Sequence, residues 1–254
     1  MDTPALIAPR RIGILEADRP APAIAARYGS YAERFAALFG AAADGRWRFR
    51  QYAVYAGELP ASADECAGWL LTGSRHGVYD ALPWMAPLAQ FLRRVVGAGV
   101  PLAGICFGHQ ILAHALGGTV EKSSRGWGLG PHRYALRDGY PWMDGDEGGQ
   151  LCLNAVHQDQ VTVAPPGAEV LAGSDFCPHA ALLYGDCALS FQAHPEFDRA
   201  FETALLTYLR DERGVLDPTH TAAALDALAD PALQLDSARV ARWVVRFFEQ
   251  RWAG

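Results

Sequence analysis

The chain has 254 residues, of which 50% are hydrophobic and 20% are charged, so its composition is that of a folded globular protein rather than a disordered or fibrous one. Its 22 Lys and Arg residues against 28 Asp and Glu residues give a formal net charge of -6, and no basic run could neutralise a phosphate backbone, so nucleic acid is not an expected partner. The longest apolar stretch, residues 95–107, is shorter than the ~20 residues that cross a bilayer and is interrupted by glycines and a proline, so no membrane partner is expected.

The first half of the chain alternates short strand-like runs with longer helical patterns. Arg11 to Ala17 predicts a first strand, and apolar residues at helical spacing from Ile24 onward predict one helix that ends at Gly40. Further strands are expected at 48–55, 69–72 and 102–105, helices at 87–98 and 109–116, and a turn-rich loop at 73–84. This order predicts an α/β fold with an open, largely parallel sheet covered by helices on both faces.

The second half begins with short strands separated by Gly, Pro and Asp turns, a pattern typical of antiparallel or mixed pairing. The expected strands are 127–136, 150–156, 160–163, 169–172, 180–184 and 188–193. A helix is expected at 197–212, and Asp217 and Asp236 are plausible starts of two more. We therefore divide the chain into an α/β domain of residues 1–210 and a C-terminal helical extension of residues 211–254 that packs on the same domain.

The five cysteines, at positions 66, 106, 152, 177 and 187, are odd in number and lack C-x-x-C spacing. This indicates neither a disulfide framework nor a zinc site, so no metal is expected. The apolar run that follows Arg10 and Arg11 is too short for a signal peptide. Together these features predict a cytoplasmic protein.

The segment 101–118 carries the clearest chemical signal. A short apolar strand enters G-I-C-F-G at 104–108 and passes directly into a helix, which is the arrangement of a nucleophile elbow with Cys106 as the nucleophile. In that geometry the sulfur lies at the carboxyl end of the sheet, beside unpaired amides at a helix start that favour the thiolate. Alternatively, Cys106 is a buried cysteine in a glycine-rich loop.

A second motif, His194-Pro195-Glu196, follows an apolar strand. Side chains two residues apart in an extended segment point to the same side, and Pro195 biases His194 toward that extended conformation. A carboxylate bonded to one ring nitrogen leaves the other nitrogen free to take the thiol proton. The two motifs together therefore predict a triad of Cys106, His194 and Glu196. Taken alone, the second motif is also compatible with a turn that ends a strand.

The residues G-I-C-F-G-H-Q at 104–110 and Q-A-H-P-E at 192–196 resemble the nucleophile and histidine motifs of class I, or triad-type, glutamine amidotransferases. Within that family the chain looks like a stand-alone member similar to the glutaminase of GMP synthase, and similarity extends over about residues 11–209. The resemblance implies a flavodoxin-like fold and no metal or organic cofactor. It also implies that Cys106 forms a γ-glutamyl thioester, that His194 acts first as base and then as acid, and that Glu196 orients His194.

The same resemblance suggests where the substrate is held. Thr72-Gly73-Ser74 is similar to the family's oxyanion strand, so the amides of Gly73 and Phe107 would bind the tetrahedral oxygen. This segment reads T-G-S where many members have G-G-P, and V-H-Q-D at 156–159 replaces a more usual S-H-x-D. The expected substrate contacts are Gln110, Ser74, His157 and Gln158.

The predicted activity is hydrolysis of the side-chain amide of glutamine, and two alternatives stay open. One keeps the triad but acts on a γ-glutamyl peptide or conjugate, and the other is a non-catalytic subunit or sensor. Only about 45 residues follow the amidase region, so any ammonia acceptor would be a partner protein in trans.

His157 with Asp159 is a second candidate base, and Arg75 and Tyr79 are candidate specificity contacts.

Overall fold

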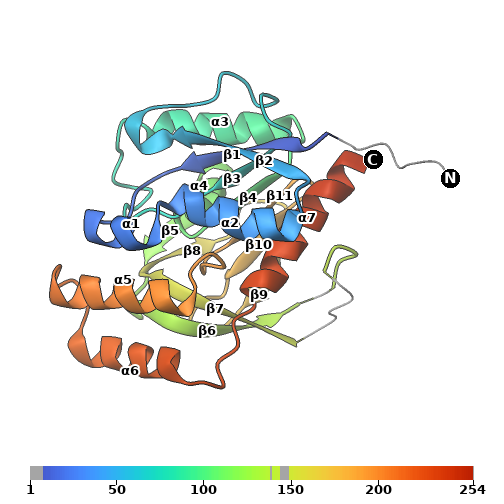
Figure 1. Cartoon of the computed structure of the whole chain (residues 1–254). Coiled ribbons are helices and arrows are strands. Elements are labelled where there is room, and N and C mark those ends of the chain that lie inside the picture. The colour runs from blue at the N-terminus through green and yellow to red at the C-terminus, as the bar shows by residue number, and fades with distance from the viewer. Residues whose placement is uncertain (1–7, 138, 144–148, 254) are drawn as a thin grey trace.

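A nine-stranded mixed sheet forms the centre of the computed structural model, which describes residues 8–137, 139–143 and 149–253 (Figure 1). The strand order is β2-β1-β3-β4-β11-β10-β9-β6-β7, and β5 and β8 form a separate antiparallel pair. The strands are β1 (Arg10–Glu16), β2 (Trp47–Ala53), β3 (Gly68–Leu71), β4 (Leu102–Ile105), β5 (Thr119–Lys122), β6 (Gly128–Leu136), β7 (Gly149–His157), β8 (Asp159–Val163), β9 (Ala168–Gly173), β10 (Ala181–Tyr184) and β11 (Ala188–Phe191).

The sheet has a parallel half and an antiparallel half. The five strands from β2 to β11 pair in parallel, and their order corresponds to the flavodoxin-like order 2-1-3-4-5. From β11 to β7 every pairing is antiparallel. The predicted α/β fold is confirmed, as is the expected change to antiparallel or mixed pairing after residue 119.

Helices cover both faces of the parallel half. Buried residues of α2 and α7 pack with one face of the sheet, and those of α3 and α4 pack with the other. Helices α5 and α6 lie against β6 and β7, and α1 packs on α5. The helices are α1 (Pro22–Tyr28), α2 (Tyr31–Ala43), α3 (Met85–Gly97), α4 (Phe107–Ala115), α5 (Arg199–Asp211), α6 (Pro218–Ala229) and α7 (Ser237–Ala253), with a 3-10 turn η1 (Val54–Ala56).

The single helix predicted from Ile24 to Gly40 is wrong, because the chain forms two helices there. Gly29 has a φ of 79°, which ends α1, and Ser30 begins α2 with a capping box. The Ser30 hydroxyl accepts from the Glu33 amide at 3.1 Å, and the Glu33 carboxylate accepts from the Ser30 amide at 2.7 Å. The apolar spacing continues across this break, so periodicity alone did not reveal it.

Strand β5 was also absent from the sequence prediction. Val120 is its single buried residue, so the strand has no alternating apolar pattern to detect. Its partner β8 was predicted, and the two strands pair at residues 119–122. The strand exists because tertiary pairing, rather than local preference, decides the conformation of so short and polar a segment.

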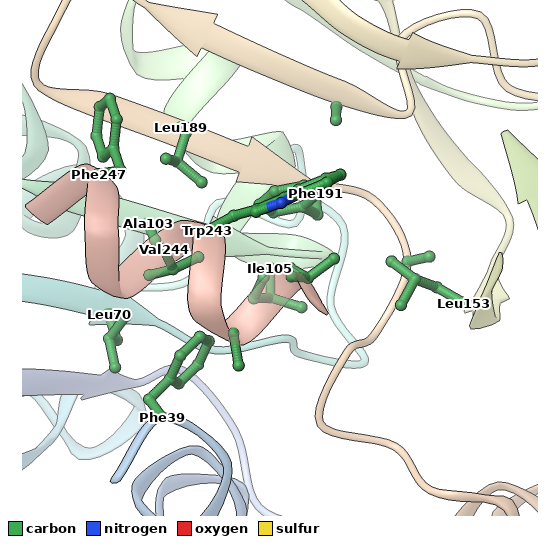
Figure 2. Packing of buried hydrophobic residues seen from close by; sticks show 14 of the residues in the cluster. Phe39, Leu70, Ala103, Ile105, Leu153, Leu189, Phe191, Trp243, Val244 and Phe247 are labelled. Atoms are coloured by element: carbon green, nitrogen blue, oxygen red, sulfur yellow. The ribbon is translucent and has the colours of Figure 1, made fainter. Parts of the chain in front are cut away.

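The final helix, α7, completes the core on one face of the sheet. Trp243, Val244 and Phe248 are fully buried, and Figure 2 shows Trp243, Val244 and Phe247 facing the sheet residues Leu70, Ala103, Ile105, Leu189 and Phe191. The Phe248 ring stacks on Trp47 with centroids 5.3 Å apart. The proposed domain boundary at residue 210 stays a prediction, since nothing in the structure tests it.

No helix within the described parts of the chain has both the length and the apolar character that a membrane crossing requires.

Because α7 is part of this core, we expect Phe248→Ala to lower the free energy of unfolding by about 3–5 kcal/mol through loss of buried area and creation of a cavity. Urea denaturation followed by circular dichroism measures this effect. Glu249→Ala on the same helix is the control. It removes only a surface ion pair with Arg46 and should change stability by less than about 1 kcal/mol. Equal midpoints for the two variants would show that α7 does not contribute to the cooperative core.

Candidate active site

Three neighbouring strands of the parallel half deliver the predicted site residues. Strands β3, β4 and β11 are adjacent and parallel, so their carboxyl ends meet at one edge of the sheet. Gly73 follows β3, Cys106 follows β4, and His194 lies shortly after β11. Ligands of open α/β sheets bind at this edge. Residues that are 33 and 88 positions away from Cys106 in the sequence therefore come together through strand order.

The turn at Cys106 is a strained elbow. Cys106 has φ 53° and ψ -105°, an uncommon conformation for a residue other than glycine, and α4 begins at the next residue. A Cβ on Gly104 would lie 2.6 Å from the Gly108 carbonyl oxygen, and one on Gly108 would lie 2.5 Å from the Leu71 carbonyl oxygen. Both glycines are therefore required so that α4 can start close to β4 and β3.

His194 and Glu196 form a buried pair. The His194 Nδ1–H donates to Glu196 Oε1 at 2.8 Å, and both side chains are almost completely excluded from solvent. The imidazole also stacks flat on the Phe197 ring, with centroids 3.9 Å apart and planes only 3° apart. This contact and the carboxylate fix the ring plane and the tautomer, which leaves Nε2 available for proton transfer.

The backbone around this pair is held by two polar residues from other elements. The backbone carbonyl of Asn154 on β7 accepts from the His194 backbone amide at 2.8 Å, and the Asn154 side-chain amide donates to the Phe197 carbonyl at 2.9 Å. Arg34 on α2 donates two hydrogen bonds to the Glu196 carbonyl, at 3.1 and 2.7 Å. The His-Pro-Glu turn is therefore fixed from both sides.

The electrostatics of the site favour a charged imidazole. Burial alone would lower the pKa of His194, but the negative charges of Glu196 and of an ionised Cys106 raise it well above its usual value. The arrangement is that of a nucleophile and base pair ready to exchange one proton.

Gly73 lies directly against both catalytic candidates. A Cβ placed on Gly73 would be 2.9 Å from His194 Cε1 and 3.5 Å from Cys106 Cβ. The Thr72 hydroxyl accepts the Ala17 amide at 3.0 Å and donates to the Gly73 carbonyl at 3.1 Å, which orients the Gly73–Ser74 peptide. Thr72, the first residue of the T-G-S sequence, thus supplies the hydroxyl that orients this peptide.

Two hydrogen-bonded glutamines lie beside Cys106, one in the pocket lining and one fully buried. The Gln192 side-chain amide donates to Cys106 Sγ at 3.8 Å, and its carbonyl accepts from the Gln110 amide at 3.2 Å. The Gln110 amide also donates to the backbone carbonyl of Asp159 at 2.9 Å. Gln110 therefore uses its N–H groups internally and keeps its carbonyl oxygen out of these bonds.

A pocket of about 430 Å³ opens over these residues. Among the residues that line it are Gly73, Ser74, Cys106, Gln110, His157, Gln158 and His194. Of the other predicted site residues, Glu196 lies behind His194, and Phe107 lies buried at the first position of α4, where backbone N–H groups have no acceptor within the helix. The structure thus brings all nine predicted site residues to one edge of the sheet, in the pocket or directly behind it.

His157 is a poor base in this structure. Burial lowers its pKa to about 3, and its Nδ1 contacts the Asp159 carbonyl oxygen at 3.1 Å. Because that oxygen can only accept, Nδ1 carries the proton of a neutral ring. His194, with its raised pKa and its carboxylate partner, is the better candidate.

The loop after β3 carries two pocket residues whose side chains bond carboxylates of other segments. Arg75 donates from Nε to Asp18 at 2.7 Å, and the Tyr79 hydroxyl donates to the Asp159 carboxylate at 2.8 Å. Both residues line the pocket, where they were expected as candidate specificity contacts. Among the described residues no group of three or more His, Cys, Asp and Glu side chains could hold a metal ion.

A family model described as "Glutamine amidotransferase class-I" matches residues 60–207, more than half of the chain. The chain belongs to this family. The family resemblance of the two motifs is thereby confirmed. Gamma-glutamyl peptidase 5 of Arabidopsis thaliana is 31% identical over 178 residues, which are 68% of this chain and 70% of that protein.

Two further comparisons, one with a curated relative and one with a solved structure, show what the chain is similar to. A GMP synthase [glutamine-hydrolyzing] of Aromatoleum aromaticum is 38% identical over 139 residues, 51% of this chain and 25% of that protein. A crystal structure of a glutamine amidotransferase from Thermotoga maritima superposes with a TM-score of 0.71 at 19% identity, covering 95% of this chain and 97% of that one. The structural match supports the fold.

Sequence reasoning missed four residues that surround Cys106, His194 and Glu196: Gln192, Asn154, Arg34 and Glu202. Gln192 stood inside a motif that was recognised, so its position two residues before His194 was a signal for it. Asn154 and Arg34 act through tertiary contacts from β7 and α2, for which the sequence holds no local signal.

Glu202 is the most unusual of the four. It lies fully buried on α5, and neither carboxyl oxygen forms a hydrogen bond of normal geometry with a described residue. Burial raises the pKa of Glu202 to about 8, although the charge of His194 and the Gly130 amide lower it, and the charge of Glu196 adds the smallest effect, a further rise. A pKa near 8 keeps the Glu202 carboxyl group mostly protonated at pH 7, which limits the buried negative charge close to Glu196.

We expect this buried acid to make the wild type less stable as pH rises. The folded state holds the Glu202 proton up to about pH 8, whereas the unfolded state releases it near the ordinary value of 4.5. This contribution to stability is fully present below pH 4.5, falls by up to about 1.4 kcal/mol per pH unit, and is lost above pH 8. Glu202→Gln replaces the ionisable carboxyl group with a carboxamide that does not titrate. The difference in unfolding free energy between wild type and variant should therefore shrink or reverse across this range.

Chemical denaturation at a series of pH values measures that difference, and Glu212→Gln, at an exposed glutamate next to α5, is the matched control. The control should keep a constant difference from wild type. A constant difference for Glu202→Gln as well would mean that Glu202 ionises normally in the folded protein.

Proposed function

We propose that this amidotransferase hydrolyses γ-glutamyl amides through a thioester on Cys106. Cys106 and His194 line one pocket, and Glu196 bonds His194 from behind; this convergence carries the proposal. Each of the three groups required for covalent acyl transfer is present, and the histidine is oriented by a carboxylate. A non-catalytic role has no comparable support, since it gives no reason for a strained elbow at a thiol beside a charged imidazole.

The first half-reaction forms the thioester. His194 takes the proton of Cys106, and the thiolate attacks the side-chain carbonyl carbon of the γ-glutamyl group. When the tetrahedral intermediate collapses, the C–N bond breaks, His194 returns the proton to the departing nitrogen, and ammonia or an amine leaves. Glu196 keeps the ring in place and stabilises its charged form during this cycle.

The second half-reaction releases glutamate. A water molecule gives a proton to His194 while its oxygen attacks the thioester, and the C–S bond breaks to regenerate the thiol. In both steps the negative oxygen would accept from the amides of Gly73 and Phe107. The bond from Thr72 to the Gly73 carbonyl keeps the adjacent peptide in a fixed orientation, as an oxyanion hole requires.

The amino-acid end of the substrate would lie on the side of Gln110 and Asp159. The Gln110 carbonyl oxygen is available to accept from an α-ammonium group, because the amide of the same side chain is already bonded internally. Ser74, His157 and Gln158 also line the pocket and are proposed to contact this end.

A second candidate substrate class, γ-glutamyl peptides or conjugates, is favoured over free glutamine by two observations. The pocket volume of about 430 Å³ falls in the range of sites for ligands larger than a single amino acid. The γ-glutamyl peptidase match covers 70% of that peptidase, whereas the GMP synthase match covers only 25% of that synthase. A partner protein that accepts ammonia is required only if glutamine is the substrate, and it stays a proposal.

A cytoplasmic location is also a proposal. All five cysteines are unpaired and buried, which is typical of proteins kept in a reducing compartment.

The proposed function is tested by measuring ammonia and glutamate released from glutamine and from γ-glutamyl dipeptides. Cys106→Ala should abolish release from every substrate, and hydroxylamine should trap a γ-glutamyl hydroxamate with the wild type alone. Substrate turnover that is unchanged in Cys106→Ala would remove the proposal. Circular dichroism of the variant distinguishes lost chemistry from lost folding.

Gly73→Ala tests the proposed oxyanion segment. The added methyl group would lie 2.9 Å from His194 Cε1, so the ring or the peptide must shift. We expect kcat to fall by about 100-fold or more, with a much smaller change in KM.

Gly97→Ala is the matched control for that substitution. Gly97 ends α3 in open space, and a Cβ there would meet no atom within 4 Å. This variant should retain wild-type kinetics, and an equal loss in both variants would contradict a specific role of Gly73.

A further inference from the structure

Tyr31, the first residue of α2, has a hydroxyl group to which no residue in the described part of the chain forms a hydrogen bond. The residue lines the active-site pocket together with Cys106 and His194, and the thioester chemistry proposed for those two residues does not use it. A phenol hydroxyl can both donate and accept, so an unbonded one in a pocket is available to a ligand.

The backbone of Tyr31 is held on both sides. The Ser30 hydroxyl caps the start of α2, and the Ala32 amide donates at 3.0 Å to the Glu16 carboxylate at the end of β1. Both bonds tie the first turn of α2 to a fixed place beside the carboxyl edge of the sheet. The Tyr31 side chain therefore enters the pocket from a rigid element and not from a loop.

Tyr31 lies on the His194 side of the pocket. Its ring stacks on Phe197 with centroids 6.0 Å apart, and Phe197 is the ring on which the His194 imidazole lies flat. Helix α2 packs on one face of the sheet, whereas α4, which carries Gln110, packs on the other. Tyr31 and Gln110 therefore approach the pocket from opposite faces of the sheet.

The surroundings of the phenol keep it neutral. Burial raises the pKa of Tyr31 well above its usual value, and the negative charges of Asp18, Glu196 and Cys106 add to this rise against an opposite effect of Arg75. Arg75 and Asp18 bond each other at 2.7 and 3.0 Å, so their ion pair is complete without the hydroxyl. The phenol stays protonated at neutral pH, and its oxygen keeps lone pairs that accept a hydrogen bond.

The leaving nitrogen of a substrate has to lie on this same side. His194 returns a proton to that nitrogen, so the nitrogen must reach Nε2 when the tetrahedral intermediate collapses. The amino-acid end of the substrate is proposed to lie on the side of Gln110. During collapse the nitrogen gains positive charge, and an oxygen that accepts one of its N–H groups stabilises this charge more in the transition state than in the bound amide.

We propose that the Tyr31 hydroxyl oxygen accepts an N–H of the leaving nitrogen and, in the second half-reaction, an O–H of the attacking water. The water takes the place of the nitrogen, with one hydrogen directed to His194, the other to Tyr31 and a lone pair to the thioester carbon. No proton leaves the phenol, so the proton still passes through His194 alone. This inference rests on the proposed γ-glutamyl amide hydrolysis and makes Tyr31 a further catalytic residue of that reaction.

The test compares γ-glutamyl-methylamide with γ-glutamyl-dimethylamide, because only the first has an N–H on the scissile nitrogen. Tyr31→Phe keeps the ring and removes the hydroxyl. It should lower kcat/KM, which reports the step that releases the amine, by about 5- to 20-fold for the methylamide and by less than about twofold for the dimethylamide. Equal losses with the two substrates, or no loss with the methylamide, would overturn the assignment.

Tyr28→Phe is the matched control. Tyr28 packs edge-on against Phe201 at 5.6 Å, as Tyr31 does at 6.4 Å, but it is not among the residues that line the active-site pocket. Loss of its hydroxyl should leave kcat/KM unchanged for both substrates. A loss as large as that of Tyr31→Phe would assign the effect to packing of the aromatic cluster and would contradict a contact with the substrate.

Direct binding separates this inference from the proposed function. In Cys106→Ala protein, calorimetry should show that Tyr31→Phe weakens binding of the methylamide by about threefold and leaves binding of the dimethylamide unchanged. That difference, without turnover of either compound by the wild type, would support the Tyr31 contact and contradict the proposed hydrolysis. Turnover that requires Cys106 but is unchanged in Tyr31→Phe would support the hydrolysis and overturn the contact. Neither turnover nor a difference in binding would contradict both.

Discussion

The turn at Cys106 is the constraint on which the rest of the site depends. The residue adopts a positive φ so that β4 can pass into α4 within one residue, and the glycines on either side leave no space for a Cβ. This close packing brings the first amides of α4 next to the sulfur. It also fixes the strands beside β4, because β3 and β11 must pair with it in register for Gly73 and His194 to reach the same point. The conformational cost of the positive φ at Cys106 is thus offset by the pairing of β4 with β3 on one side and with β11 on the other.

Around this turn the protein keeps its charges few and fixed. Glu196 and His194 neutralise each other, and the aromatic ring of Phe197 covers the imidazole. Arg34 donates to the Glu196 backbone carbonyl, and burial keeps the Glu202 carboxyl group mostly protonated nearby. The interior of the site therefore holds one paired imidazole and carboxylate beside an uncharged acid.

Much of this architecture was readable from the sequence because it depends on local rules. Glycines around Cys106, the spacing of His194 and Glu196 and the alternation of strands with helices each carry their own physical signal. The parts that were missed depend on distant contacts. The break at Gly29 interrupts a continuous apolar stripe, β5 is too short and polar to show alternation, and Asn154 contacts the His194 turn only after β7 has joined the sheet. The charge state of Glu202 depends on burial by several elements, which no window of sequence contains.

The position of α7 has a consequence for biosynthesis. Strands β3 and β4, which precede Gly73 and Cys106, leave the ribosome early, but one face of their sheet is covered by Trp243, Val244 and Phe248, which emerge far later. Until then that face of the sheet is an uncovered apolar surface, and such surfaces are prone to aggregate. The core on this face of the sheet can therefore close only after α7 has been synthesised.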